Sequence, residues 1–186
     1  MKIGLALGGG GVLGVAHLAL IEELEKNNII VSAVAGTSAG AIIGGLYAYG
    51  GVEKVTEFVK QLKEKQILSR RKMLLSVHPD NLFNKIEELL KELIIEDDFS
   101  RMQKPLLIIA TDIDKASTVV IDKGSVVKAI MASAAYPGVF SYRQIDGIRL
   151  MDGGVTNNLP VDVLKKIGCD YIIASSLNRL KDTSHD

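Results

Sequence analysis

The sequence predicts an α/β protein: a three-layer α/β/α sandwich with a mostly parallel central sheet and a helical insertion. The chain opens with two successive units of apolar strand, glycine-rich turn and helix, and this alternation gives parallel strands with helices on both faces of the sheet. Hydrophobic residues make up 47% of the chain but aromatic residues only 5%. The core is therefore mainly aliphatic, as a parallel sheet covered by helices requires. We expect residues 1–186 to form a single domain.

The first 50 residues hold both units. Their expected elements are strand Lys2–Leu7, loop Gly8–Gly11, a helix to about Asn27, strand Ile29–Ala35, turn Gly36–Gly40 and helix Ala41–Tyr49. Apart from His17, the stretch from Ile3 to Ile21 carries no ionisable side chain, which a hydropathy window could interpret as a membrane span. The five glycines at positions 8, 9, 10, 11 and 14 would each cost a helix about 1 kcal/mol, so we expect a buried strand, a loop and a buried helix.

Residues 53–103 are expected to form a helical insertion beside the sheet. Apolar residues recur at helical spacing in two stretches, Glu53–Leu68 and Leu82–Ile95. The sheet then resumes, with strands Pro105–Thr111 and Thr118–Ile121, helix Ser125–Ala135, a hairpin in Gln144–Leu150, helix Val161–Ile167 and strand Tyr171–Ser175.

Charge and cysteine content exclude several classes of protein. Lysine and arginine number 22, as do aspartate and glutamate, so there is no overall basic field to hold a nucleic acid. The single cysteine, Cys169, cannot form an internal disulfide bond, in agreement with a reducing compartment. We expect a cytoplasmic protein without a transmembrane segment.

The segment Gly36-Thr37-Ser38-Ala39-Gly40 fits the pattern GXSXG between a strand and a helix. In a nucleophile elbow the serine adopts a strained backbone conformation, so the flanking residues Gly36 and Gly40 must be small. The helix that follows directs its free N–H groups toward a developing oxyanion. The alternative is a tight turn in which Ser38 merely caps the helix.

A second glycine-rich loop precedes the first helix. Gly9, Gly11 and Gly14 fit G-x-G-x-x-G, the dinucleotide-binding fingerprint. That function requires a carboxylate at the end of the next strand, and none occurs there. The consecutive glycines, among them Gly10, instead suit a backbone that approaches a tetrahedral intermediate closely and presents bare N–H groups.

The general base for Ser38 is predicted to be Asp152. The usual order of a triad is serine, acid and then histidine, and His17, His78 and His185 are all poorly placed for it. In Asp152-Gly153-Gly154 the glycines allow a tight turn around the carboxylate, and burial would raise its pKa. On local sequence alone, an Asp-Gly turn of a hairpin is an equally good interpretation.

Three blocks in this order resemble the signature of the patatin-like phospholipases, in particular their bacterial branch: Gly8–Gly14, Gly36–Gly40 and the DGG motif Asp152–Gly154. Ala132–Phe140, Ala110–Asp112 and Val155–Asp162 also resemble this family. The resemblance implies a Ser38–Asp152 catalytic dyad acting on acyl esters, typically phospholipids or lysophospholipids. It also implies an oxyanion hole from Gly9, Gly10 and Gly11, and neither metal nor organic cofactor.

One position departs from the family pattern. The family usually carries arginine or lysine immediately before the last glycine of the loop, where this chain has Leu13. The alternative function is therefore a catalytically weak lipid-binding or regulatory protein on the same fold.

The sequence of the insertion also predicts which part of the protein contacts lipid. Basic side chains lie close to the apolar run 73–75, a combination suited to an anionic lipid surface: Lys60, Lys63, Lys65, Arg70, Arg71 and Lys72. This pattern predicts that the insertion acts as a lid with peripheral contact at the inner membrane surface. The alternative is a solvated helix face beside a core-directed loop.

Overall fold

The structure, a computed structural model, describes residues 1–67 and 79–177. Within them a seven-stranded sheet has the order β5-β6-β3-β2-β1-β7, with β4 also paired to β3. The strands are β1 (Ile3–Leu7), β2 (Ala33–Thr37), β3 (Leu106–Asp112), β4 (Ser117–Ile121), β5 (Arg143–Ile145), β6 (Ile148–Asp152) and β7 (Tyr171–Ser175). Strands β7, β1, β2 and β3 are parallel, whereas β4 and β6 run antiparallel to β3. The predicted central α/β sheet is confirmed, and it is mixed: three of its pairings are parallel and three, including β5 with β6, are antiparallel.

Strand β3 is shared by two strands along one edge. Its first half, from Leu106 to Ile109, pairs with β2, and its last three residues pair with β6. Strand β4 pairs with Ile108 to Asp112 and so occupies the opposite edge. Strands β2 and β6 approach each other from opposite directions along the same edge of β3, and their carboxyl ends meet there.

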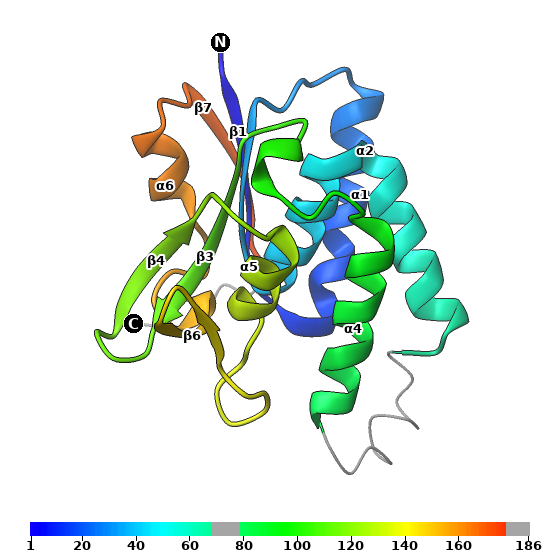
Figure 1. Ribbon diagram of the computed structural model, residues 1–186. Helices are drawn as coiled ribbons and strands as arrows, with labels where there is room; N and C mark the ends of the chain where they lie inside the picture. The colour runs from blue at the N-terminus through cyan, green and yellow to red at the C-terminus, as the bar shows by residue number, and fades with distance from the viewer. Residues whose placement is uncertain (68–78, 178–186) are drawn as a thin grey trace, which may run out of the picture.

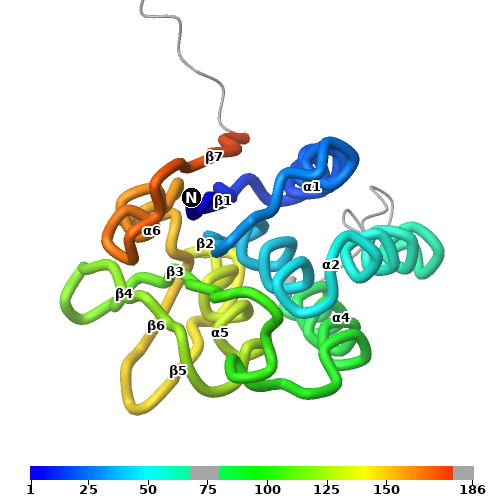
Figure 2. Tube along the Cα trace, turned by 90° about the horizontal axis from the view of Figure 1, so that it is seen from above, coloured from blue at the N-terminus to red at the C-terminus, as the bar shows by residue number. Residues whose placement is uncertain are grey.

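Helices cover both faces of the sheet, which confirms the three-layer sandwich (Figure 2). One face packs against α1 (Ala16–Lys26), α2 (Ala39–Glu64) and α5 (Val126–Ser133), with α4 (Pro79–Leu93) outside them. The other face packs against the short helix α6 (Val161–Lys166). Successive residues of a strand point to opposite faces, so Val34 joins the larger core and its neighbours Ala33 and Ala35 pack toward α6.

The predicted first insertion helix is the second half of α2. The backbone departs from helical geometry at Gly50 and Gly51, where φ reaches +73° at Gly51. The two expected helices therefore follow one another across a sharp break, because glycine tolerates this conformation without steric cost. The structure ends the second half at Glu64, and residues 68–78 of the expected insertion lie outside the described part.

The far end of the insertion is tied to the sheet domain. The backbone N–H of Gln103 donates to the carbonyl of Ala48 in α2 at 2.8 Å. The Asp97 carboxylate accepts from the Ser125 hydroxyl at 2.5 Å and from the Val127 N–H at 2.8 Å, at the start of α5. The insertion is therefore fastened to α2 and α5, two of the helices that flank the sheet.

The remaining turns are short: η1 (Gly11–Val15), η2 (Phe99–Arg101) and η3 (Gly153–Val155). Residues 3–21 form strand, loop, η1 and the start of α1, as expected from the glycines. In the described residues, no helix is both long and apolar enough to span a bilayer.

Candidate active site

Ser38 lies on a sharp turn between β2 and α2. Its backbone angles are φ +54° and ψ −119°, a strained combination for a residue other than glycine. A side chain at Gly36 would collide with the backbone of Gly40, and one at Gly40 with the carbonyl of Leu7. The predicted elbow geometry is present, with Gly36 and Gly40 small for steric reasons.

The Ser38 side chain makes no capping hydrogen bond to α2. This observation disfavours the alternative in which the serine serves only as a helix cap, since a capping serine accepts from the N–H groups of the first turn. The hydroxyl instead lies beside the carboxyl of Asp152 in the same cavity and acts to lower the pKa of that carboxyl.

Asp152 is the last residue of β6 and is only 4% exposed. Its Oδ1 accepts the backbone N–H of Gly154 at 2.7 Å, within the turn that begins at Gly153. Burial raises the pKa of the Asp152 carboxyl, and the hydrogen bonds from Ser38 and from Gly154 offset this effect only in part. A carboxylate with a raised pKa is a stronger base than an exposed aspartate.

The end of α5 holds both Ser38 and Asp152 in place. The hydroxyl of Ser133, which is fully buried, accepts the Ser38 N–H at 2.8 Å and donates to the Ile109 carbonyl at 2.5 Å. Two residues further on, the carbonyl of Ala135 accepts the Asp152 N–H at 3.0 Å. One short segment therefore fixes the backbone of both residues.

Ser133 lies in the segment Ala132–Phe140, but the sequence pattern predicts no role for it. A usable signal was present: Ser133 ends a helix whose other residues are apolar apart from Lys128. A buried hydroxyl in such a helix must have a partner, because leaving it unpaired costs free energy.

The glycine loop lies directly against Ser38. A Cβ atom at Gly9 would come within 3.1 Å of the Ser38 Cβ and 2.6 Å of the Asn158 Oδ1, so no side chain fits there. The N–H of Gly9 donates to the carbonyl of Asn158 at 3.3 Å. In the described part of the chain the N–H groups of Gly10 and Gly11 make no hydrogen bond, so these two are the loop donors left for a ligand.

Asn158 is a second residue whose contacts the sequence did not predict. Its side-chain Nδ2 donates to the carbonyl of Gly9 at 3.4 Å, and its own carbonyl accepts from the same glycine. The neighbouring Asn157 accepts the hydroxyl of Thr37 through its carbonyl at 2.9 Å. The segment after the DGG motif thus joins the glycine loop to the elbow.

His17, the one histidine in the described part of the chain, supplies no base for Ser38. His17 is fully buried, and its two ring nitrogens are engaged by Gly8 and Ser175. His78 and His185 lie outside the described residues. Among those residues, no group of three or more histidine, cysteine or acidic side chains could hold a metal ion.

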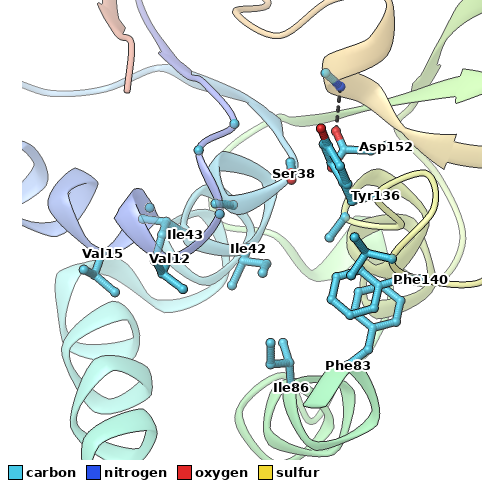
Figure 3. Close-up of a pocket in the computed structure, with 18 of the residues that line it drawn as sticks. Val12, Val15, Ser38, Ile42, Ile43, Phe83, Ile86, Tyr136, Phe140 and Asp152 are labelled. Atoms are coloured by element: carbon cyan, nitrogen blue, oxygen red, sulfur yellow. Dashed lines mark hydrogen bonds between the residues drawn. The ribbon is translucent and has the colours of Figure 1, made fainter. Parts of the chain in front are cut away.

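Ser38 and Asp152 open into an apolar cavity of about 510 Å³ (Figure 3). Glycines 9–11 border it beside the serine, and its walls come from α2, α4 and the segment after α5. The apolar lining includes Ile42, Ile43, Phe58, Leu62, Leu82, Phe83, Ile86, Val139 and Phe140. The rings of Phe83 and Phe140 are stacked, with centroids 4.3 Å apart, and so join α4 to the segment after α5.

Comparison with known proteins finds relatives over most of the chain. The family model described as patatin-like phospholipase matches residues 5–165, which include the glycine loop, the elbow and the DGG motif. An uncharacterized NTE family protein of Mycobacterium tuberculosis is 31% identical over 177 residues, covering 95% of this chain and 49% of its own length. The neuropathy target esterase sws of Drosophila melanogaster is 31% identical, covering 98% of this chain and 13% of its own length.

A further relative and a solved structure are also similar to this chain. A lysophospholipase NTE1 of the yeast Scheffersomyces stipitis is 31% identical over 97% of this chain and 12% of its own length. The chain thus spans half or less of the length of these relatives. Among solved structures, VipD of Legionella pneumophila shares the fold, with a TM-score of 0.62 at 14% identity over 86% of this chain and 47% of VipD.

The family match spans most of the chain and contains the elbow serine, the buried aspartate and the glycine loop. The chain therefore belongs to the patatin-like phospholipase family.

Proposed function

We propose that this chain is a serine acyl-ester hydrolase of the phospholipase A, lysophospholipase or esterase type. Ser38 is the nucleophile, Asp152 its base, and Gly10 and Gly11 of the glycine loop supply the oxyanion donors. The third predicted donor, the N–H of Gly9, is bonded to Asn158 instead. One observation carries the proposal: the strained Ser38 and the buried Asp152, whose pKa is raised, share one apolar cavity. The names of two relatives, an esterase and a lysophospholipase, support ester hydrolysis.

In the first half of the reaction, the Asp152 carboxylate takes the proton of the Ser38 hydroxyl as its oxygen attacks the ester carbonyl carbon. The carbonyl π electrons move onto oxygen, and this oxyanion meets the N–H groups of Gly10 and Gly11. The intermediate then collapses with cleavage of the C–O bond. The alcohol leaves with the proton that Asp152 held, and the acyl group stays on Ser38.

In the second half, water replaces the alcohol. Asp152 takes a proton from the water as it attacks the acyl carbon, a second oxyanion forms at the same donors, and the Ser38 oxygen leaves. Asp152 returns the proton to Ser38, which releases the fatty acid. Every proton moves through one carboxylate, so this cycle uses neither histidine nor cofactor.

The cavity suits the acyl part of the substrate. Apart from the glycines, its lining beyond Ser38 is mostly aliphatic and aromatic, and among the described lining residues Asp152 is the one carboxylate. Burying an acyl chain there gains about 0.8 kcal/mol for each methylene group. Helix α4 and the second half of α2 supply the wall opposite Ser38, so we propose that the insertion at 53–103 faces the substrate as a lid.

The mouth of the cavity gives a reason for peripheral contact with lipid. Four apolar or aromatic residues line the cavity and are also exposed: Val12, Val15, Tyr136 and Val139. A lipid could pass from a bilayer surface across this rim into the cavity without its chain crossing water. Of the predicted basic residues, Lys60 and Lys65 form ion pairs with Glu64 and Glu92, and residues 70–75 lie outside the described chain. The rim is therefore the stronger argument.

The absence of tryptophan from the sequence makes the rim easy to test. Val139→Trp should show a blue-shifted, more intense emission with neutral phosphatidylcholine vesicles. Tyr171→Trp, at the exposed end of the edge strand β7 that lies away from the glycine loop, should not. A Val139→Trp spectrum unchanged by neutral or anionic vesicles would contradict docking through the rim.

Hydrolysis of a panel of acyl esters by the wild type and by Ser38→Ala tests the proposed activity. A fluorophosphonate probe separates it from the alternative function: an activated Ser38 is labelled covalently, whereas a lipid-binding protein of the same fold leaves the probe unreacted. A wild type that binds fatty acid but neither reacts with the probe nor releases product would contradict the proposal.

A further inference from the structure

Helix α1 carries a fully buried histidine, His17, that takes no part in the proposed proton transfers. Its Nε2 lies 2.8 Å from the carbonyl oxygen of Gly8, and its Nδ1 lies 2.9 Å from the hydroxyl of Ser175. A carbonyl can only accept, so Nε2 must carry the proton. Nδ1 then accepts from the Ser175 hydroxyl.

Burial lowers the pKa of His17 below its ordinary value, and the Gly8 hydrogen bond opposes this effect only in part. The ring is therefore neutral at neutral pH, as the arrangement of one donor and one acceptor nitrogen requires. The two contacts tolerate one tautomer only.

Three hydrogen bonds link His17, Gly8 and Ser175 to one another at the start of the glycine loop. The N–H of Gly8 donates to the carbonyl of Ser175 at 2.9 Å, and its carbonyl accepts from His17. The N–H and the carbonyl of Gly8 thus join strand β7 to helix α1, one residue before Gly9, which lines the cavity.

The geometry of the following peptides carries this restraint to the oxyanion donors. The peptide between Gly8 and Gly9 is hydrogen-bonded at both ends: its carbonyl accepts from His17, and its N–H donates to the carbonyl of Asn158. A trans peptide is planar and its C=O and N–H point in opposite directions. Fixing this plane therefore restricts the next peptide, which bears the free N–H of Gly10.

From these contacts we infer that His17 is a positioning residue: its neutral Nε2–H form orients the glycine loop so that the N–H groups of Gly10 and Gly11 face the oxyanion. This inference rests on the proposed ester hydrolysis for its kinetic consequence. The ring touches neither substrate nor Ser38, and it acts through Gly8 alone.

Two substitutions separate positioning from packing. His17→Gln keeps a donor for Gly8 and an acceptor for Ser175, whereas His17→Leu keeps neither. His17→Leu should lower kcat about 10–100-fold with little change in KM, because a misplaced oxyanion donor costs less than the ~10²–10³-fold loss of a full donor. His17→Gln should restore kcat to within a few-fold of the wild type. Leu24→Ala, in a buried position of the same helix, should destabilise the protein but leave kcat unchanged.

Ser175→Ala is a second test of the positioning role, to be used if His17→Leu does not fold. It removes the hydroxyl that fixes the tautomer but leaves the Gly8 contact, so we expect a smaller, several-fold loss of kcat. If a folded His17→Leu or Ser175→Ala turns over esters like the wild type, the positioning role is wrong.

NMR tests the same inference without turnover. Spectra of ¹⁵N-labelled histidine should show a neutral Nε2–H ring for His17, and the amide signals of Gly10 and Gly11 should shift in His17→Leu but not in Leu24→Ala. An inactive wild type with these shifts would contradict the proposed hydrolysis and support the loop positioning. Unshifted amides, or an Nδ1–H tautomer, would overturn the positioning whatever the activity.

Discussion

Thr37 and Asp152 lie opposite consecutive residues of β3, Thr37 opposite Ile109 and Asp152 opposite Ala110. Strand β2 runs parallel to β3 and β6 runs antiparallel to it, so the two chain segments arrive at this point head to head. The residue after Thr37 is Ser38, which is why a serine and an aspartate 114 positions apart in the sequence lie side by side in one cavity.

Because Ser38 and Asp152 lie side by side, we expect their side chains to act as one catalytic unit. Ser38→Ala and Asp152→Asn should each lower kcat on acyl esters ~10⁴-fold or more while the protein stays folded, and the double variant should be little worse than either one. Steady-state kinetics with thermal melts measure this. Additive losses, or near-normal turnover by Ser38→Ala, would refute the dyad.

The raised pKa of Asp152 predicts a pH dependence of activity. The carboxyl must be ionised to act as base, so kcat/KM should fall as the pH drops through a value above the ordinary aspartate pKa of 3.8. The pH profile of kcat/KM on a short, soluble acyl ester measures this value. An acid limb at or below 3.8 would contradict a buried base.

The same shift predicts a pH dependence of stability. Above pH 3.8 the folded chain still holds the Asp152 proton where the unfolded chain has released it. The unfolded state binds fewer protons, so this residue's contribution to the free energy of unfolding falls as pH rises through the raised pKa. Asp152→Asn does not titrate there and should gain stability relative to the wild type as the pH is raised. Urea titrations across that range would show the difference, and a constant difference would argue against the shift.

Ser133→Ala tests the support beneath Ser38. The substitution leaves the Ser38 N–H and the Ile109 carbonyl without their buried partner, at a cost of about 1–3 kcal/mol in stability. Because the backbone of the nucleophile is released, kcat should also fall, by about tenfold. Ser125→Ala, at the N-cap of the same helix, should cost about 1 kcal/mol without changing kcat. Equal kinetics for both variants would assign Ser133 to stability alone.

Ile86→Trp tests the assignment of the cavity to the acyl chain. Ile86 lines the wall formed by α4, so an indole there should shorten the longest acyl chain that is hydrolysed efficiently. Lys85→Trp, on the exposed side of the same helix, should leave the chain-length profile unchanged. A profile unaltered by Ile86→Trp would place the acyl chain elsewhere.

Leu13→Arg tests the departure from the family pattern. Leu13 is 58% exposed in η1, so an arginine there remains solvated and should not unfold the protein. If a basic side chain braces the loop, kcat on short esters should rise by less than the ~10²–10³-fold attributed to a full donor, with a smaller effect on KM. An unchanged kcat would show that the contacts of His17 and Asn158 brace the loop sufficiently.

Sequence by itself determined the layers and most elements, because they depend on local patterns. Strand β7 has the predicted bounds. Glycines also mark the glycine loop and the elbow, the two turns that lie at Ser38. The steric limit on Gly36 acts within five positions, since its neighbour is the backbone of Gly40, whereas Gly40 is limited by Leu7 of β1. The same locality explains the smaller errors, such as β2 starting four residues late and α2 continuing past its break at Gly50 and Gly51.

The tertiary structure alone decided which side chains meet. On local sequence, Asp152 could have been a hairpin turn, and only the pairing of β6 with the last residues of β3 places its carboxyl beside Ser38. Ser133, His17 and Asn158 acquire their partners through contacts that span 9 to 158 positions. Such contacts depend on strand order and register, which no local pattern encodes, and they fix the backbone angle of the serine and the direction of the loop N–H groups.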